Sequence, residues 1–246
     1  MPNFAVVIPA YNEAATIRDL AERALRVCPR VIVVDDGSTD GTAEILAGVP
    51  VQVLRNDRNL GKAASLWRGA QAALAHGVEW IVTLDGDGQH APEDVPRLVG
   101  VARQHPRCIV IGARLADRAA IPKLRYFANR VAIFWLSWAC GQRLEDSQSG
   151  FRVYPAEIFR RLSVPHDRRH GFVFESEILI EAARLGYRCV MAPIAAVYRP
   201  NARASYFRHM DTARITRMVA WKLLSRGLYL QGLYRAYFRR SAKSGQ

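Results

Sequence analysis

Apolar, β-rich stretches alternate with stretches of helical repeat through the first 112 residues of this chain. Strands that are apolar along their whole length and separated by helices are typical of a parallel sheet with both faces covered. The alternation therefore predicts an α/β fold with a mostly parallel central sheet and helices on both faces. The expected strands are Phe4–Ile8, Val31–Val34, Val51–Leu54, Trp80–Leu84 and Ile109–Ile111, and the expected helices are Ala14–Arg26, Thr42–Leu46, Lys62–Ala75 and Val95–Gln104.

The pattern changes after Gly112. A long helical stretch is expected at Lys123–Cys140, a further helix in "FVFESEILIEAARLG", and a strand in "RCVMAPI". From Asp211 onward, apolar and basic residues alternate at helical period, which predicts amphipathic helices with a basic polar face. We therefore expect one domain over residues 1–205, with halves at 1–112 and 113–205, and a basic helical tail over 206–246.

Composition narrows the class of protein. Half of the residues are apolar, which is enough for a sizeable core. The four cysteines are far apart in sequence and form no CxxC pair, which favours a reducing compartment over a zinc site or a disulfide framework. The first residues lack the pattern of a signal peptide, and no apolar run reaches the roughly 18 residues that span a bilayer. We expect a soluble or membrane-surface protein.

Positive charge is concentrated in the tail. The chain carries a net charge of +13, and residues 201–246 hold ten Lys or Arg against one acid, so the tail accounts for +9 of it. Such a segment favours an anionic partner, which could be membrane lipid, nucleic acid or a phosphate-bearing substrate. The alternative is a pair of packing helices whose basic faces simply meet water.

Polar motifs follow three of the expected strands, namely "PAYNE", "DDGSTDGT" and "DGDGQH". Ligands of open parallel sheets bind beyond the carboxyl ends of the strands, so these motifs should converge on one edge. Asp85 and Asp87 are two residues apart, and carboxylates held so close require a proton or a cation between them. Turn formation and helix capping are the alternative for Thr39 and Asp40. For Lys62 the alternative is a solvated lysine at a helix start.

Five motifs in order resemble those of the family-2 inverting glycosyltransferases, in particular the dolichyl-phosphate-mannose and polyprenyl-phosphate-sugar synthases. They are "VVIPAYNEAATI", "VIVVDDGSTDGT", "NLGKAAS", "TLDGDGQHAPED" and "DSQSGFRVY", and the likeness extends from residue 4 to about residue 200. The resemblance implies a GT-A type fold that binds a nucleotide-diphospho-sugar, linked to UDP or GDP. It departs from the family at Gly86 and Gly88, where the synthases commonly have Ala and Leu, and at Tyr206, where a lysine is expected.

The resemblance also implies roles for individual residues. The metal, Mg²⁺ or Mn²⁺, would be held by Asp85, Asp87 and Gln89, and a bound cation would neutralise the charge on the departing nucleoside diphosphate. The nucleotide would be bound by Pro9, Tyr11, Glu13, Asp36, Lys62 and Asp85. Catalysis would involve Asp87, Asp146 and Arg114.

The nature of the acceptor decides what else the site needs. A hydroxyl acceptor requires a general base, for which Asp146 is the candidate, with Glu175 and Glu177 as alternatives. A phosphate acceptor is already ionised and requires cations instead. Whether Asp146 removes a proton or orients its loop is left open. The expected acceptor-binding residues are Arg130, Gln148, Ser149, Arg152, Arg199 and Arg203.

The leading hypothesis is a hexosyltransferase that uses a lipid-linked acceptor, a polyprenyl phosphate, at the inner face of the cytoplasmic membrane. The tail would hold it peripherally on anionic lipid, since each basic residue near the surface adds about 1 kcal/mol. The alternatives are transfer to a hydroxyl of a glycolipid or saccharide, and a nucleotidyltransferase or nucleotide-sugar hydrolase. A basic nucleic-acid-binding module is not expected, because it leaves the acidic motifs unexplained.

Overall fold

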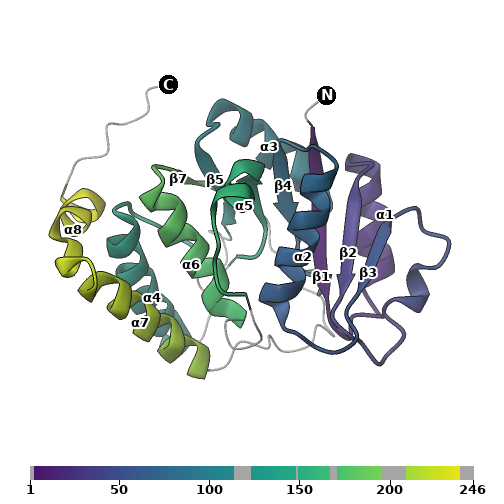
Figure 1. Ribbon diagram of the computed structural model, residues 1–246, viewed down its shortest axis with the longest axis horizontal. Helices are drawn as coiled ribbons and strands as arrows, with labels where there is room; N and C mark the ends of the chain where they lie inside the picture. Colours follow the sequence, from purple (N-terminus) through teal and green to yellow (C-terminus); the bar gives the residue numbers. More distant parts are fainter. Residues whose placement is uncertain (1–2, 114–122, 148, 167–170, 195–208, 239–246) are drawn as a thin grey trace.

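The structure is a computed structural model that describes residues 3–113, 123–147, 149–166, 171–194 and 209–238 (Figure 1). Its centre is a seven-stranded sheet in the order β3-β2-β1-β4-β6-β5-β7. β6 runs antiparallel to both of its neighbours, and every other pairing is parallel. The strands are β1 (Phe4–Ala10), β2 (Val31–Asp35), β3 (Gln52–Arg55), β4 (Trp80–Thr83), β5 (Cys108–Ala113), β6 (Arg152–Pro155) and β7 (Arg188–Pro193).

Helices cover both faces of this sheet. The α-helices are α1 (Ile17–Val27), α2 (Lys62–Ala75), α3 (Val95–Gln104), α4 (Lys123–Cys140), α5 (Ala156–Arg161), α6 (Gly171–Arg184), α7 (His209–Leu224) and α8 (Leu230–Tyr237). Short 3₁₀ turns occur at η1 (Glu44–Leu46), η2 (Pro92–Asp94) and η4 (Gly227–Tyr229). The predicted fold class, an α/β fold with a mostly parallel sheet, is confirmed.

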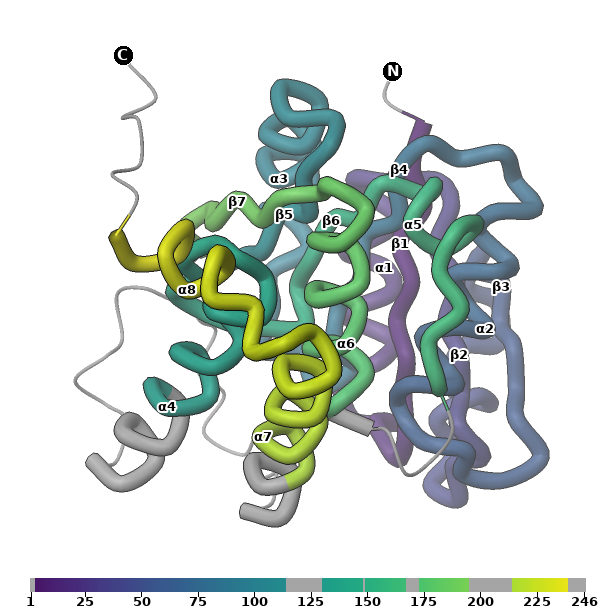
Figure 2. Tube along the Cα trace, turned by 60° about the vertical axis from the view of Figure 1, so that its left-hand side comes forward, coloured from purple at the N-terminus to yellow at the C-terminus, as the bar shows by residue number. Residues whose placement is uncertain are grey.

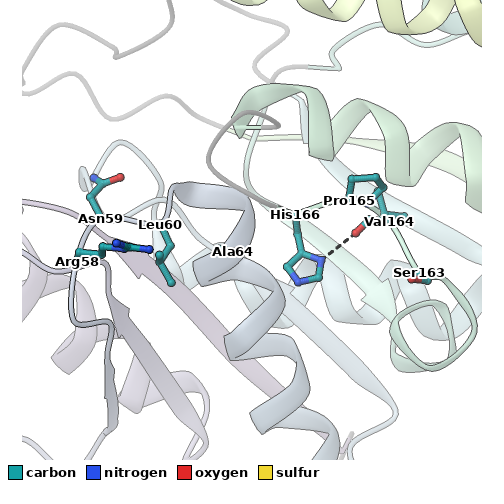
Figure 3. A pocket seen from close by; sticks show the side chains of 8 residues that line it. All are labelled: Arg58, Asn59, Leu60, Ala64, Ser163, Val164, Pro165 and His166. Carbon is teal, nitrogen blue, oxygen red and sulfur yellow. Dashed lines mark hydrogen bonds between the residues drawn. The ribbon is translucent and has the colours of Figure 1, made fainter.

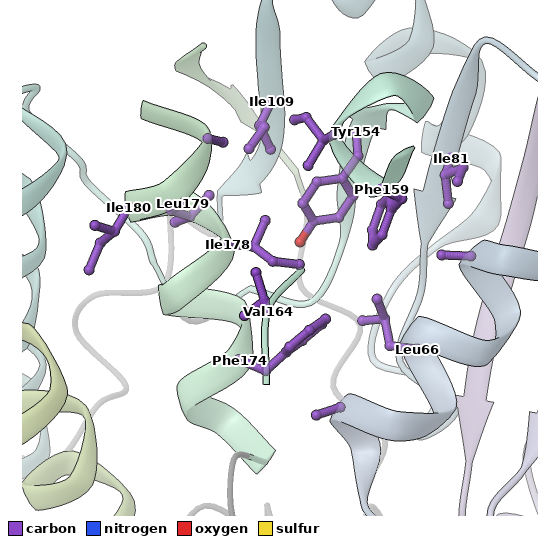
Figure 4. Packing of buried hydrophobic residues seen from close by; sticks show 14 of the residues in the cluster. Leu66, Ile81, Ile109, Tyr154, Phe159, Val164, Phe174, Ile178, Leu179 and Ile180 are labelled. Carbon is purple, nitrogen blue, oxygen red and sulfur yellow. The ribbon is translucent and has the colours of Figure 1, made fainter. Parts of the chain in front are cut away.

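The alternation of side chains along β1 separates two hydrophobic cores. Val7 packs in a core with side chains of α2, α4, α5 and α6, part of which is drawn in Figure 4. Ile8 points to the other face and packs with side chains of α1 and α3. Successive residues of a strand face opposite sides, so a strand between two helical layers must be apolar at every position. This is why β1 is an unbroken apolar run.

The sequence did not predict two consecutive elements, which are the strand β6, inside the sheet between β4 and β5, and the short helix α5 that follows it. β6 has only four residues and begins with a fully buried arginine, Arg152. A charged residue in so short a segment is typical of a polar loop, so the sequence does not indicate a strand here. Its register places Thr83 of β4 opposite Arg152. The helix expected over Ala14–Arg26 also begins later, at Ile17, because the residues before it are bonded to a neighbouring loop.

The tail helices lie against the body of the molecule (Figure 2). α7 packs on α4 and α6, and its buried stripe is Ile215, Val219 and Leu223. Lys222 of the same helix pairs with Glu177 at 2.8 Å and with Glu181 at 2.6 Å. One apolar stripe of the expected amphipathic tail is therefore part of the core. In the described part of the chain, no helix is both long enough and apolar enough to cross a membrane.

Candidate active site

The three polar motifs converge at the carboxyl ends of β2, β1 and β4, which are neighbours in the sheet. Backbone hydrogen bonds continue the pairing of β1 and β2 past their ends, since the amide of Asp36 donates to the carbonyl of Ala10 at 2.8 Å. The hydroxyl of Thr16 donates to the carbonyl of Gly86 at 2.7 Å, which joins the first motif to the third. The expected convergence is thus present in the structure.

Hydrogen bonds from backbone amides to side chains hold the first two motifs together. The amide of Glu13 donates to the hydroxyl of Thr42 at 2.8 Å, and Asp40 accepts from the amide of Ala14 at 3.1 Å. Burial raises the pKa of Asp40, but hydrogen bonds from Thr42 and Ala14 outweigh it, so that this pKa lies below its ordinary value. Asp40 therefore fixes one loop against the other, and it also forms a local turn by accepting a hydrogen bond from the amide of Thr42 at 3.1 Å, as the turn interpretation expected.

Asp36, expected among the nucleotide-binding residues, is buried, and its carboxylate holds the segment that leads into α2. It accepts hydrogen bonds from the amides of Leu60 and Gly61, each at 2.8 Å, and from the side chain of Asn56 at 2.7 Å. This fixes the start of α2, and with it Lys62, against the end of β2.

Lys62 joins the third motif to α6. Its ammonium lies 2.6 Å from Oδ1 of Asp85 and 3.2 Å from Oε1 of Glu175. Glu175 is buried, whereas the side chains of Lys62 and Asp85 retain about a quarter of their exposure. Burial lowers the pKa of Lys62, but the two carboxylates more than compensate and its pKa is raised. Lys62 is therefore firmly charged, and the interpretation as a solvated helix-start lysine does not apply.

Gly150 brings the loop before β6 against Asp85. A Cβ atom at Gly150 would lie 2.4 Å from both carboxylate oxygens of Asp85, so only glycine leaves room for them. The hydroxyl of Thr83 fixes the same loop by donating to the carbonyl of Gly150 at 2.7 Å. The acidic motif and the loop with the "DSQSGF" sequence thus form one continuous surface.

Of the other expected residues in the second half of the domain, some lie in the described part of the chain and some do not. Asp146 accepts a hydrogen bond from the amide of Ser149 at 3.2 Å, within the same loop. Arg130 is exposed on α4. Four expected residues lie outside the part of the chain that is described, namely Arg114, Gln148, Arg199 and Arg203.

Arg152, expected to bind the acceptor, is fully buried. Its guanidinium donates to the carbonyls of Ser147 at 2.7 Å, Ser149 at 2.8 Å and Glu175 at 2.9 Å. This geometry favours a role in positioning the loop and the start of α6 over direct contact with an acceptor. Glu177, the second alternative base, pairs with Lys222 of the tail and so lies in a structural ion pair.

The profile of the family described as "Glycosyl transferase family 2" matches residues 5–166, about two thirds of the chain, which includes the three polar motifs, Lys62 and the loop of Gly150. This chain belongs to glycosyl transferase family 2. The family resemblance seen in the motifs is confirmed.

Named relatives are similar over most of the chain. Polyprenol monophosphomannose synthase of Mycolicibacterium smegmatis is 29% identical over 79% of this chain and 77% of its own length. Undecaprenyl-phosphate mannosyltransferase of Micrococcus luteus is 27% identical over 89% of this chain and 94% of its own length. Among solved structures, glucosyl-3-phosphoglycerate synthase from Mycobacterium tuberculosis, in complex with Mn²⁺, UDP-glucose and phosphoglyceric acid, covers 92% of this chain. That match has a TM-score of 0.66 at 24% identity and covers 79% of the solved chain, which establishes the shared GT-A fold.

The expected metal ligands of this family-2 member, Asp85, Asp87 and Gln89, suit a divalent ion that a substrate also coordinates. Within the described ranges, no group of three or more His, Cys, Asp and Glu forms a closed metal site. Asp85 and Asp87 are close enough to influence each other, since burial and then the charge of Asp85 raise the pKa of Asp87. Mg²⁺ is commonly bound by one or two carboxylates, with substrate phosphates and water completing its shell. Two carboxylates and the amide of Gln89 fit that mode of binding.

An open hollow of ≈ 810 Å³ lies beside α2, between the segment that Asp36 holds and the segment after α5 (Figure 3). Arg58 and Leu60 line one side of it, and Val164 and His166 line the other. His166 stacks on Trp67 of α2 with ring centroids 5.0 Å apart. The hollow gives the site an apolar flank next to the start of α2.

Sequence reasoning missed the partnership between Lys62 and Glu175 and the close approach of Gly150 to Asp85. The sequence indicates Glu175 only as an alternative base. The one signal in the sequence was a pair of acids in the apolar helix "FVFESEILI", where a buried carboxylate needs a cation.

Proposed function

We propose that this protein is a metal-dependent inverting hexosyltransferase that uses a UDP- or GDP-linked sugar as donor and a polyprenyl phosphate as acceptor. The observation that carries the proposal is the contact between Asp85 and Gly150, because it joins the acidic motif to the loop before β6, in the second half of the domain. The names of the relatives from Mycolicibacterium smegmatis and Micrococcus luteus support the choice of acceptor.

In this proposal the ends of β1 and β2 bind the nucleotide. Pro9, Tyr11 and Glu13 contact the base and ribose, and Asp36 fixes the segment that carries Lys62. Asp85, Asp87 and Gln89 hold Mg²⁺ or Mn²⁺, which neutralises the charge that develops on the departing nucleoside diphosphate. Gly86, whose Cβ position lies 3.0 Å from the carbonyl of Pro9, keeps this loop close to the end of β1.

An ionised phosphate oxygen of the acceptor attacks the anomeric carbon from the face opposite the diphosphate. The new carbon–oxygen bond forms as the bond to the diphosphate breaks, so the configuration inverts. The acceptor needs no general base, which agrees with an Asp146 carboxylate that accepts a hydrogen bond from its own loop. The proposed acceptor contacts are Arg114, Arg130, Gln148, Arg199 and Arg203. Arg152 holds the loop of Ser149 in place, and Ser149 is itself fully buried.

A soluble phosphorylated acid is the second candidate acceptor. It is motivated by the solved structure of glucosyl-3-phosphoglycerate synthase, which contains UDP-glucose and phosphoglyceric acid. The test is incubation with labelled UDP- and GDP-sugars, Mn²⁺ and either polyprenyl phosphate or phosphoglyceric acid, followed by extraction into organic solvent. Metal-dependent label in the organic phase, abolished by a chelator and by Asp87→Ala, supports the proposal. Label that stays in water, as product or as free sugar, refutes the lipid acceptor.

We further propose that the tail docks on an anionic membrane surface. The side of α7 that faces away from the core carries Arg214, Arg217, Trp221 and Leu224, and Trp221 is 71% exposed. Arginines followed by apolar side chains on one helix face suit a surface with anionic headgroups above acyl chains. α8 and the residue that follows it add further exposed apolar side chains, namely Leu230, Tyr234 and Tyr237 on the helix and Phe238 after it.

Sedimentation with vesicles tests this docking. The wild type should bind vesicles containing phosphatidylglycerol and bind phosphatidylcholine vesicles several-fold less. Trp221→Ser combined with Leu224→Ser should release it, whereas Ile45→Ser, at an exposed apolar position on η1, should not. Equal binding by all variants refutes the assignment of this face. A dimer that the double variant abolishes, without any vesicle binding, would assign the face to a second copy of the chain instead.

A further inference from the structure

We infer that Lys62 acts as a built-in competitor of the divalent cation, and that Glu175 sets how strongly it competes. The inference rests on the metal site of the proposed function. It concerns the free protein, in which the ammonium of Lys62 lies 2.6 Å from Oδ1 of Asp85. That oxygen belongs to an expected metal ligand, so a metal ion and the ammonium require the same carboxylate.

The two cations cannot both stay at that contact. An ammonium already satisfies part of the negative charge of Asp85, and a divalent ion beside the same carboxylate repels it. Binding of Mn²⁺ or Mg²⁺ therefore requires Lys62 to withdraw from Asp85. Metal affinity in the absence of nucleotide is lowered by the free energy of that separation.

Glu175 gives Lys62 a place to withdraw to. Its carboxylate oxygens lie 3.2 Å and 3.3 Å from the ammonium, slightly farther than the contact with Asp85. Glu175 is buried, and an uncompensated buried carboxylate is costly, so it retains the lysine when the metal arrives. The ammonium thus moves a short distance and stays beside the site.

A retained ammonium has a use once the donor is present. Lys62 is the first residue of α2, and the N-terminus of a helix favours negative ligands. A diphosphate between the metal and the start of α2 can bind both cations at once. Metal and nucleotide should therefore bind cooperatively, because the diphosphate relieves the repulsion between Lys62 and the metal.

The experiment is a Mn²⁺ titration of the full chain, with free Mn²⁺ counted by electron paramagnetic resonance, first without nucleotide and then with UDP. Lys62→Met should bind Mn²⁺ about tenfold or more tightly without nucleotide, since one neighbouring charge shifts proton binding by a similar factor. Addition of UDP should then improve Mn²⁺ binding less than it does in the wild type. Glu175→Gln should weaken Mn²⁺ binding without nucleotide, because the lysine then lacks the carboxylate that draws it away from Asp85.

A matched control is available on the tail side of α6. Lys222 also bridges two glutamates, at 2.6 Å and 2.8 Å, so Lys222→Met removes a similar ion pair away from the site and should leave Mn²⁺ binding unchanged. Lys62→Met leaves Glu175 buried without the lysine, which lowers stability. The double variant Lys62→Met with Glu175→Gln removes both charges and should still bind Mn²⁺ more tightly than the wild type.

The outcomes separate this inference from the proposed function. If UDP promotes Mn²⁺ binding to the wild type but neither Lys62→Met nor the double variant gains affinity without nucleotide, the competition is refuted and the metal site stands. The same holds if Glu175→Gln binds Mn²⁺ more tightly. If no variant binds Mn²⁺ even with UDP, the metal site and the competition both fail.

Discussion

Gly150 provides the sharpest test of how the site is assembled. In a Gly150→Ala variant the new Cβ would lie 2.4 Å from both carboxylate oxygens of Asp85 and 2.6 Å from its Cγ. Real Cβ contacts do not come within 3.0 Å, so the carboxylate must retreat by about half an ångström or more. Displacing a group at a reacting centre by about 1 Å can cost 10²-fold in rate. We therefore expect kcat/KM for sugar transfer to fall about tenfold to a hundredfold.

The same substitution should cost comparatively little stability. Overpacking a well-filled site costs about 1–3 kcal/mol, and the low end applies here because a carboxylate can rotate. For a chain of this size that corresponds to a fall in Tm of a few degrees, which differential scanning calorimetry resolves. The matched control is Gly100→Ala on α3, where a Cβ meets nothing within 4 Å and helix propensity favours alanine by about 1 kcal/mol. Activity of Gly150→Ala within twofold of wild type would refute the reasoning, and so would a loss of activity explained by global unfolding.

Three further substitutions test the packing and the ion pairs. Arg152→Met should lower the free energy of unfolding in urea by about 3–5 kcal/mol, because the buried carbonyls it binds lose their donors. Gly69→Ala should cost about 1–3 kcal/mol, since its Cβ would lie 2.4 Å from Cγ1 of Val7, and a second change, Val7→Ala, should recover part of that loss. The hydrogen bond from Arg23 lowers the pKa of Glu93 from 4.5 to about 2. Above pH 4.5 this exposed pair therefore stabilises the folded state by less than about 1 kcal/mol, and this stabilisation is lost as the pH falls towards 2. Glu93→Gln should therefore be slightly less stable than wild type at pH 7 and equally stable at pH 2, and an equal difference at both values would contradict the assignment.

The sequence predicts those strands and helices whose apolar residues follow a regular pattern along the chain. Strands buried on both faces give unbroken apolar runs and amphipathic helices impose a period of 3.6, and α2, α3 and α4 have the bounds that the pattern indicated. The sequence does not predict β6, because four residues are too few to show a pattern and because a buried arginine is rare. The burial of Arg152 depends on three carbonyls from other segments, and no local pattern reports them.

The candidate site was predictable to the same extent. The rule that parallel strands present their carboxyl ends on one edge is enough to predict that the motifs of Tyr11, Asp36 and Asp85 lie together. It could not place Glu175, which lies 113 residues after Lys62 and reaches it only through the packing of α6 against α2. Nor could it tell that the tail lysine Lys222 is tied to α6 rather than exposed to solvent. Contacts between distant segments carry no signature in a single sequence.

The position of β6 has a consequence for how the chain folds during synthesis. β4 leads into Asp85 and β5 lies two strands away, and the strand that fills the gap between them emerges from the ribosome only with residues 152–155. Until then the first half of the chain exposes an unpaired edge of β4, to which neighbouring nascent chains can add. The acidic motif and Gly150 therefore reach their final contact in one late event, after more than half of the chain has been made. Ribosome-bound nascent chains that end before β6 should be protease-sensitive around β4, and chains that extend well past it should be protected.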